Sequence, residues 1–263
     1  MFGTKTKILN ELSRRWHYYK MPFNVLRPMM LNELQKLNLT RTAQYIYCDF
    51  YFRHFLPQEL IEHRKYFVEE NRGFGEDAFH AMWYLLLMEL KPKRALEIGV
   101  YRGQTITLWK LISKIGGFDC SVACVSPFSS IGDSVSRYKN DIDYFEDTKK
   151  NHARFNLPMP EIYRGYSTEP GAVAFIQSRR WDLIYIDGNH NYDIVLQDWE
   201  VCSRAISRGG VIVLDDSALY TDYRPPRFAT AGHPGPSKVA DDIAESEFKE
   251  IFHTGHNRAF QKL

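Results

Sequence analysis

From about residue 94 onward, short apolar runs alternate with longer segments of helical periodicity, and this alternation restricts the fold more than any other feature of the chain. A helical segment follows each of the first four apolar runs. Strands and helices that alternate at this spacing form parallel βαβ units, so we expect an α/β fold with a doubly wound, mostly parallel sheet. Strands are predicted at residues 94–98, 121–125, 161–165, 181–187 and 211–216.

The C-terminal part of the chain extends this sheet. Residues 248–253 and 258–263 are typical of an antiparallel hairpin with its turn at 254–257, which brings the predicted sheet to seven strands. The proline-rich segment 219–237 predicts a long loop after the fifth strand, where a loop indicates function or mobility. Helices are predicted at residues 78–90, 104–115, 141–155, 172–178, 193–206 and 238–246.

The first 74 residues are rich in aromatic side chains and show a helical pattern without strands. We expect a helical extension, 1–74, beside an α/β domain, 75–263. The extension would serve as a cap, a wall of the substrate site or an oligomer contact. Residues 1–41 carry eight Lys and Arg against two Glu. A solvated arm is the favoured interpretation of this charge, and a patch that docks an anionic substrate, a lipid surface or a partner subunit is the alternative.

Composition argues against several classes of protein. The formal net charge is only +2, and the chain lacks an aromatic–proline tetrapeptide of the Asn-Pro-Pro-Tyr kind, so a nucleic-acid substrate is not expected. The four cysteines show no CxxC or Cys/His ligand spacing, which argues against structural zinc. No apolar run reaches the roughly 18 residues of a membrane span, and no secretory signal follows Met1. We therefore predict a cytoplasmic protein without a transmembrane segment.

The first predicted strand runs into a turn in which Gly99 and Gly103 enclose three residues. This G-x-x-x-G spacing is neither the G-x-G-x-x-G of dinucleotide-binding folds nor a phosphate-binding loop. Glu97, just before the turn, would repel a pyrophosphate but suits a ligand with an ammonium group, such as the methionyl end of S-adenosylmethionine. Cofactor contacts are predicted for Glu97, Gly99, Tyr101 and Gly103, although a tight structural turn could use the same glycines.

Carboxylates end the fourth and fifth predicted strands. Asp187 ends the fourth, and Asp215 and Asp216 end the fifth. Because neighbouring parallel strands end at the same edge of a sheet, these three side chains should lie close together. A hard divalent cation such as Mg²⁺ would relieve their repulsion, so a metal site is predicted at Asp187, Asp215 and Asp216. Asp187 is also expected to contact the cofactor or the reaction centre, while Asp215 could instead only cap a turn.

His190 lies three residues beyond Asp187, in the loop that leaves the same edge. An imidazole has an ordinary pKa of about 6.5, which suits the removal of a hydroxyl proton near neutral pH. We therefore predict His190 as the general base, with Asp187 as the second catalytic residue. His233, in the proline-rich loop, is the other histidine whose position merits attention.

Three motifs together resemble a known family. Residues 95–103 (ALEIGVYRG), 186–192 (IDGNHNY) and 209–216 (GGVIVLDD) look like the macrocin-type sugar and antibiotic O-methyltransferases and the broader bacterial class I S-adenosylmethionine-dependent group, and more distantly like catechol O-methyltransferases. The resemblance covers about residues 75–263. It implies a Rossmann-like class I methyltransferase fold, S-adenosylmethionine as donor and methyl transfer to a hydroxyl, often on a sugar. It also implies magnesium at Asp187, Asp215 and Asp216, and a base at His190.

The second strand departs from this family, in which it commonly ends in an acid that binds the ribose hydroxyls. Ser126 stands there instead, and a hydroxyl cannot bridge two hydroxyls as a carboxylate does. Asp133 is a candidate to compensate. Ser167, in the segment 164–167 after the third strand, matches the position that frames the adenine. Ser126 and Ser167 are therefore also predicted to contact the cofactor.

The sequence thus predicts an S-adenosylmethionine-dependent, magnesium-assisted O-methyltransferase whose acceptor is a sugar, a glycoside or another small polyol. One alternative is a metal-independent N- or O-methyltransferase of small molecules. The other is a non-catalytic subunit that only binds the cofactor. A homo-oligomer formed through the N-terminal segment is also compatible with the sequence.

Overall fold

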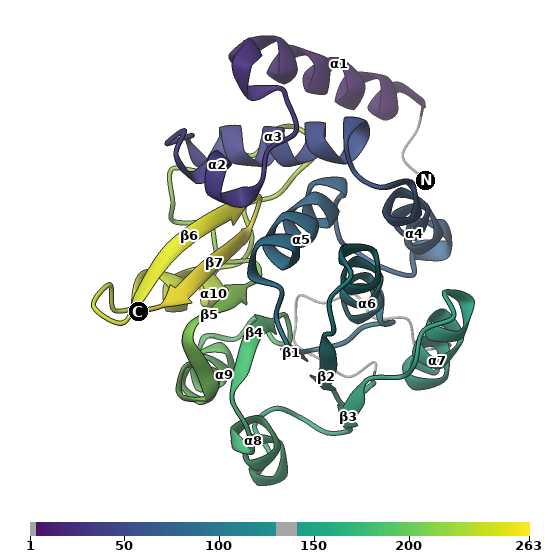
Figure 1. Ribbon diagram of the computed structural model, residues 1–263, viewed down its shortest axis with the longest axis vertical. Helices are drawn as coiled ribbons and strands as arrows, with labels where there is room; N and C mark the ends of the chain where they lie inside the picture. Colours follow the sequence, from purple (N-terminus) through teal and green to yellow (C-terminus); the bar gives the residue numbers. More distant parts are fainter. Residues whose placement is uncertain (1–3, 130–140) are drawn as a thin grey trace.

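The structure, a computed structural model, describes residues 4–129 and 141–263. A seven-stranded sheet lies at its centre, in the order β3-β2-β1-β4-β5-β7-β6 (Figure 1). β7 runs antiparallel to both of its neighbours, and the other neighbouring pairs are parallel. The predicted doubly wound α/β fold with seven strands is confirmed. The strands are β1 (Arg94–Ile98), β2 (Ser121–Val125), β3 (Glu161–Tyr163), β4 (Trp181–Ile186), β5 (Ile206–Leu214), β6 (Phe248–Thr254) and β7 (Asn257–Lys262).

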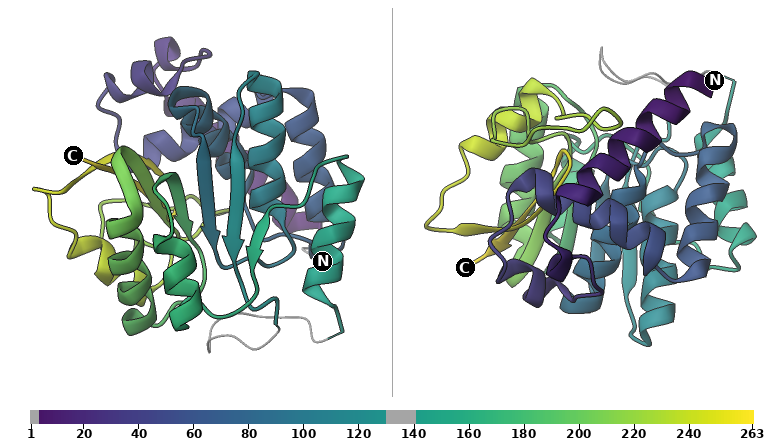
Figure 2. Two further views of the ribbon diagram at one scale, coloured as in Figure 1. Left: turned by 60° about the horizontal axis from the view of Figure 1, so that its bottom comes forward. Right: turned by 90° about the horizontal axis from the view of Figure 1, so that it is seen from above.

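Helices cover both faces of this sheet (Figure 2). Successive strand residues point to opposite faces, so Leu183 and Tyr185 join the core that packs against α5 and α6, while Ile184 and Ile186 join the core under α8, α9 and α10. This two-sided burial explains why apolar residues predominate in the central strands β1, β2 and β4 and in the second half of β5. The helices are α5 (Asp77–Leu90), α6 (Gln104–Gly116), α7 (Tyr144–Arg154), α8 (Pro170–Gln177), α9 (Tyr192–Ala205) and α10 (Pro234–Asp241).

The N-terminal segment is helical, as its pattern predicts, and packs on the α5 side of the sheet. Tyr45, Tyr47 and Cys48 of its third helix are buried in the same core as α5 and α6. The extension therefore shares the hydrophobic core of the α/β part. Its elements are α1 (Thr4–Lys20), η1 (Phe23–Val25), α2 (Leu31–Gln35), α3 (Arg41–His54), α4 (Gln58–Val68) and η2 (Glu69–Asn71).

Four element boundaries differ from the sequence prediction by more than two residues. α7 begins at Tyr144 instead of residue 141, because Asp143 caps the helix by accepting a hydrogen bond from the N–H of Glu146. α10 ends at Asp241 instead of residue 246. β5 begins at Ile206 instead of residue 211, because the strand bulges between its pairs with Trp181 and Leu183, and Gly209 takes a positive φ of 77° there. α10 begins at Pro234 instead of residue 238, because a proline in the first helical turn lacks only an N–H that would have no partner. The proline-rich loop is correspondingly shorter than predicted.

All four cysteines lie in the described part of the chain, and each is buried with a free thiol. Each therefore serves as a small apolar side chain of the core. No helix among the described residues combines the length and apolar character that crossing a bilayer requires.

A buried pair of histidines joins the N-terminal segment to the helices behind the sheet. His63 Nδ1 of α4 lies 3.0 Å from His80 Nε2 of α5, and His63 Nε2 lies 2.9 Å from the Thr107 hydroxyl of α6. Burial lowers the pKa of His63 to about 3 and that of His80 well below its ordinary value. Both rings are therefore neutral in the folded protein at neutral pH.

This pair should make the protein sensitive to acid. The unfolded chain binds a proton on His63 near pH 6.5 and the folded chain only near pH 3, so the free energy of unfolding falls as the pH is lowered through this interval. We expect His63→Gln to reduce the number of protons taken up on unfolding between pH 6.5 and 3 by about one. Chemical denaturation at several pH values measures this number. His54→Gln, at an exposed position, is the control, and an equal slope in both variants would contradict the assignment.

Candidate active site

The carboxyl ends of β1, β2, β4 and β5 border a cavity of about 910 Å³. A cavity of this size can enclose a cofactor together with a small acceptor. Every residue that the sequence predicts for the site lines it: Glu97, Gly99, Tyr101, Gly103, Ser126, Ser167, Asp187, His190, Asp215 and Asp216. Asp133 lies outside the described residues.

The glycines of the turn after β1 allow close packing of backbone segments. Gly99 has a φ of 90°, and a Cβ built there would lie 2.2 Å from the carbonyl oxygen of Asp187. Gly103 has a φ of 83° and precedes α6, where a Cβ would lie 2.9 Å from Thr148 Cγ2. These two positions therefore have a structural need for glycine. They also leave the first N–H groups of α6 beside the cavity, where an anionic or polar ligand group can meet them.

Glu97 is a buried carboxylate at the wall of the cavity. Its Oε2 has no hydrogen-bond partner among the described residues. Burial raises the pKa of Glu97 to about 8, a hydrogen bond to Thr105 opposes this rise, and the charge of Asp215 adds to it. A cationic group in the cavity would give this oxygen a partner and restore the charged form. The geometry therefore fits an ammonium-bearing ligand.

The two serines that are predicted to contact the cofactor both form hydrogen bonds within the protein. The Ser126 hydroxyl donates to the carbonyl oxygen of Val100 at 3.0 Å and accepts from the N–H of Phe128 at 3.2 Å. Ser167 forms a side-chain hydrogen bond with Asp198, whose pKa burial raises to about 7. Ser126 thus joins the turns after β1 and β2, and a contact with ribose remains a prediction for it.

An aromatic wall lines another part of the cavity. The ring centroids of Phe74 and Tyr101 are 4.8 Å apart, and those of Tyr101 and Tyr144 are 4.9 Å apart. Phe74 belongs to the N-terminal extension and is 65% exposed, although it lines the cavity. The extension therefore reaches the cavity through Phe74, and its role as a wall of the substrate site stays a prediction.

Asp187 and Asp215 are held side by side by the ends of neighbouring strands. The N–H of Asp187 donates to Ile98 O at 2.8 Å, and the N–H of Asp215 donates to Ile186 O at 3.0 Å. Their carboxyl groups share a hydrogen bond, which requires a proton on one of them. Burial raises the pKa of both groups, and the charge of Asp215 raises that of Asp187 further.

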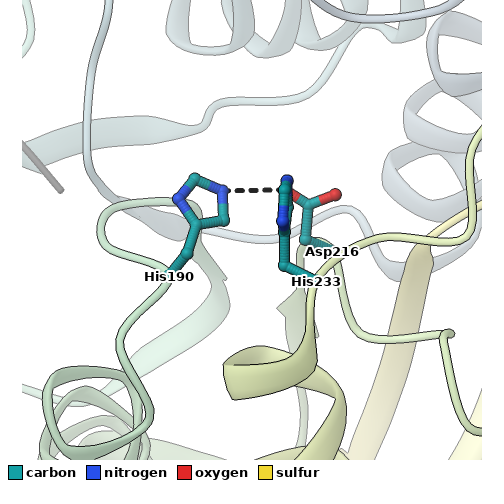
Figure 3. Close-up of side chains that lie close together, drawn as sticks. All are labelled: His190, Asp216 and His233. Atoms are coloured by element: carbon teal, nitrogen blue, oxygen red, sulfur yellow. Dashed lines mark hydrogen bonds and ion pairs between the residues drawn. The ribbon is translucent and has the colours of Figure 1, made fainter. Parts of the chain in front are cut away.

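The pKa of Asp216 is lowered, in contrast to the raised pKa values of Asp187 and Asp215. His190 Nε2 lies 2.8 Å from Asp216 Oδ2, and His256 Nδ1 lies 2.8 Å from Asp216 Oδ1. Burial opposes ionisation of Asp216, but these hydrogen bonds outweigh it and hold the pKa of the carboxyl well below its ordinary value. Figure 3 shows His190 and Asp216 pointing toward each other, with His233 beside them and its Nε2 3.8 Å from Asp216 Oδ2. The described structure therefore gives Asp216 three histidine neighbours.

His256 is a site residue that the sequence analysis did not identify. It lies in the hairpin turn between β6 and β7, and the pairing of Leu214 with Arg258 places that turn beside the end of β5. Burial lowers its basicity, but the charges of Asp215 and Asp216 outweigh burial and raise the pKa of His256 to about 10. A cation from the far end of the chain therefore lies among the acids, and the hairpin pattern alone gave no indication of this.

The three predicted metal ligands do not form a single group. Among the described residues, two sets of side chains lie close enough to hold one ion: Asp215, Asp216 and His256, and His190, Asp216 and His233. Asp187 belongs to neither set and instead contacts Asp215. All three acids line the same cavity, with Asp187 against Asp215 and histidines against Asp216.

Comparisons with known proteins agree with this geometry. Residues 96–217 match a protein-family model described as a methyltransferase domain. An uncharacterised protein of Acanthamoeba polyphaga mimivirus is 25% identical over 191 residues, which span 69% of this chain and 76% of that protein. The described fold is similar to the SAH-bound methyltransferase PaMTH1 of Podospora anserina, with a TM-score of 0.57, 12% identity, and 90% and 98% of the two chains covered. It is similarly close to an O-methyltransferase of Bacillus cereus in complex with SAH, with a TM-score of 0.55, 15% identity, and 85% and 100% covered.

Residues 96–217 therefore match a methyltransferase domain, and the described residues adopt the class I methyltransferase fold. The predicted enzyme class, a methyltransferase, is confirmed by the match of residues 96–217. The macrocin-type acceptor, the magnesium ion and the individual site residues stay predictions.

A substitution at Gly99 tests the close packing of the turn after β1 against the backbone at Asp187. Gly99→Ala should destabilise the fold by more than about 1 kcal/mol and abolish binding of S-adenosylhomocysteine, because the new Cβ would overlap the backbone at Asp187. Thermal unfolding and isothermal titration calorimetry measure the two effects. Gly117→Ala is the matched control, since Gly117 also has a positive φ, of 64°, but open space around its Cβ position. Equal binding by the two variants would show that the close approach of the two turns is not needed.

Proposed function

We propose that this protein transfers the methyl group of S-adenosylmethionine to a hydroxyl of a small polyhydroxylated molecule, such as a sugar or a glycoside. The observation that carries this proposal is the His190–Asp216 hydrogen bond at the wall of the cavity that Glu97 also lines. A base held by a carboxylate suits the removal of a hydroxyl proton, and a buried acid suits the ammonium group of the donor. The acceptor class itself rests on the resemblance of the sequence motifs.

Glu97 and the turn 99–103 form the donor side of the site. The buried Oε2 of Glu97 would accept hydrogen bonds from the ammonium group, and binding of that cation would shift Glu97 to its charged form. S-adenosylmethionine supplies, when bound, a methyl group on a positively charged sulfur that a nucleophilic oxygen can attack. The aromatic wall of Phe74, Tyr101 and Tyr144 offers surfaces for flat or apolar parts of either substrate.

His190 performs the proton transfer. Asp216 is ionised, so a neutral His190 would donate its Nε2–H to Asp216 and would carry its lone pair on Nδ1. Nδ1 would take the proton of the acceptor hydroxyl while the hydroxyl oxygen forms a bond to the methyl carbon and the carbon–sulfur bond breaks. Asp216 then stabilises the imidazolium that results. The products are the methyl ether and S-adenosylhomocysteine, with one proton left on His190.

The acids also fit a divalent cation. Asp215 Oδ1 is buried and accepts no hydrogen bond from the described residues, and the contact between Asp187 and Asp215 needs a proton or a cation between the two groups. We propose that Asp187, Asp215 and Asp216 would hold magnesium here, as the sequence predicts. Such an ion would bind the acceptor's hydroxyl oxygens and lower the pKa of one of them.

A metal-independent methyltransferase is the second candidate, and His256 favours it. Its charged ring lies 2.8 Å from Asp216 and 3.6 Å from Asp215, so a cation of the protein itself already offsets part of the acidic charge. In this case His190 and Asp216 would suffice to activate the acceptor. The two candidates share the donor site and differ only in their need for an added ion.

His190→Ala should lower kcat by about 100-fold or more while leaving binding of S-adenosylhomocysteine unchanged, because only the proton acceptor is removed. Transfer of labelled methyl groups into a saccharide extract, followed by mass spectrometry, measures turnover and identifies the product. His233→Ala is the control on the neighbouring ring. Undiminished turnover of His190→Ala would refute the base assignment, and binding without any turnover in the unchanged protein would favour the non-catalytic subunit.

Removal of divalent ions should abolish turnover, and added Mg²⁺ should restore it. Asp215→Asn should then require more Mg²⁺ for half-maximal activity, because a ligand charge is lost. Activity after EDTA treatment and calorimetric titration with Mg²⁺ measure both effects. An enzyme that is indifferent to EDTA would support the metal-independent candidate and leave methyl transfer itself intact.

A further inference from the structure

The N-terminal helix α1 packs on the rest of the molecule through polar side chains. Arg14 Nε donates to Asp49 Oδ2 at 2.8 Å, and the Tyr18 hydroxyl donates to the same oxygen. Asp49 of α3 is almost fully buried, and the Arg14 guanidinium lies 4.3 Å from the centre of the Phe228 ring. Since the partners are buried, these contacts fix the rotation of α1 about its own axis.

The apolar side of α1 faces away from the protein. Ile8, Leu12, Trp16 and Tyr19 recur every three or four residues and therefore form one stripe along the helix. Their exposed fractions are 54%, 57%, 56% and 84%, and Phe23, just after the helix, is 93% exposed. We call these five residues the outer stripe. Figure 1 shows α1 as the outermost layer, beyond α3.

This orientation reverses the usual arrangement of a surface helix, which buries its apolar stripe and exposes its charges. A contiguous exposed apolar surface of this kind marks an interaction site in soluble proteins. Core packing therefore does not account for Trp16, Tyr19 or Phe23.

Basic side chains border the outer stripe. Lys5, Arg15 and Lys20 are exposed along it, and Lys20 Nζ lies 4.5 Å from the centre of the Trp16 ring. Glu11 is the acidic residue of α1, and both Arg14 and Arg15 pair with it. Two copies that met through this stripe would bring like charges together. A negatively charged surface complements them instead.

We propose that the outer stripe docks the protein on an anionic lipid bilayer. α1 would lie in the plane of the headgroups, with Ile8 and Leu12 in the apolar boundary, Trp16 and Tyr19 at the interface, and the lysines against lipid phosphates or carboxylates. This inference does not depend on the acceptor or on the metal. The basic N-terminal segment would then have an anionic lipid surface as its partner.

Co-sedimentation of the full-length protein with vesicles tests the proposal. We expect binding to phosphatidylcholine vesicles that contain phosphatidylserine, weaker binding as salt rises, and little binding to phosphatidylcholine alone. Lys5→Gln with Lys20→Gln should weaken the partition coefficient roughly 25-fold, at about fivefold for each cation lost. Leu12→Gln, Trp16→Gln and Phe23→Ser together should weaken it at least about tenfold.

Matched changes at the exposed end of α6 provide the controls. Lys114→Gln and Ile115→Gln remove a cation and an apolar side chain at another exposed place, and they should bind vesicles like the unchanged protein. Thermal unfolding and binding of S-adenosylhomocysteine should be equal in all variants, which separates docking from folding and from methyl transfer. Absence of binding to the anionic vesicles, or equal binding by the stripe variants, would overturn the proposal. A dimer that the stripe variants dissociate, in a protein that ignores vesicles, would overturn it in favour of self-association.

Discussion

Four carboxyl groups at one edge of the sheet, two of them buried and two half-buried, are the constraint on which the site depends. Glu97, Asp187, Asp215 and Asp216 all line the same cavity, and the desolvation of charged groups is costly when they repel one another. The protein compensates with a proton shared by Asp187 and Asp215, and with the imidazole rings at Asp216. Compensation is incomplete at Glu97 and at Asp215, where a carboxyl oxygen of each lacks a hydrogen-bond partner among the described residues. The site is therefore suited to ligands that bring positive charge.

Distant parts of the chain supply this compensation together. β7 pairs with β5 and so carries His256 to the acids, while Phe79 of α5 lies against the His256 ring at a centroid distance of 4.8 Å. Glu76, just before α5, adds to the charges that raise the pKa of His256, and it accepts a hydrogen bond of 2.6 Å from Tyr45 of α3. Charge interactions and hydrogen bonds thus connect the N-terminal helices, the sheet and the C-terminal hairpin around His256. A division of the chain near residue 74 describes its sequence pattern better than its packing.

The sequence predicted what depends on local pattern and on strand direction. β1 and β2 are bounded as predicted because each is a short apolar run between two helical segments, and the acids meet because parallel strands end at one edge. His256 was missed because its position depends on an antiparallel register between Leu214 and Arg258, which no local pattern specifies. The orientation of α1 was missed for a similar reason. A helix with apolar residues is normally assigned to the core, and only the buried Arg14–Asp49 contact shows which side faces inward.

The serine after β2 fits the same charge constraint. An acid at position 126 would add a fifth carboxyl group to the four that line the cavity, where the His256 cation already pairs with Asp216 and Arg102 with Asp147. Ser126 avoids that charge, and its hydroxyl joins the turns after β1 and β2 instead, through Val100 and Phe128. Binding of the ribose would then rely on groups other than a carboxylate at this position. The departure from the family pattern is thus consistent with a site in which acidic charge is concentrated near the reacting atoms.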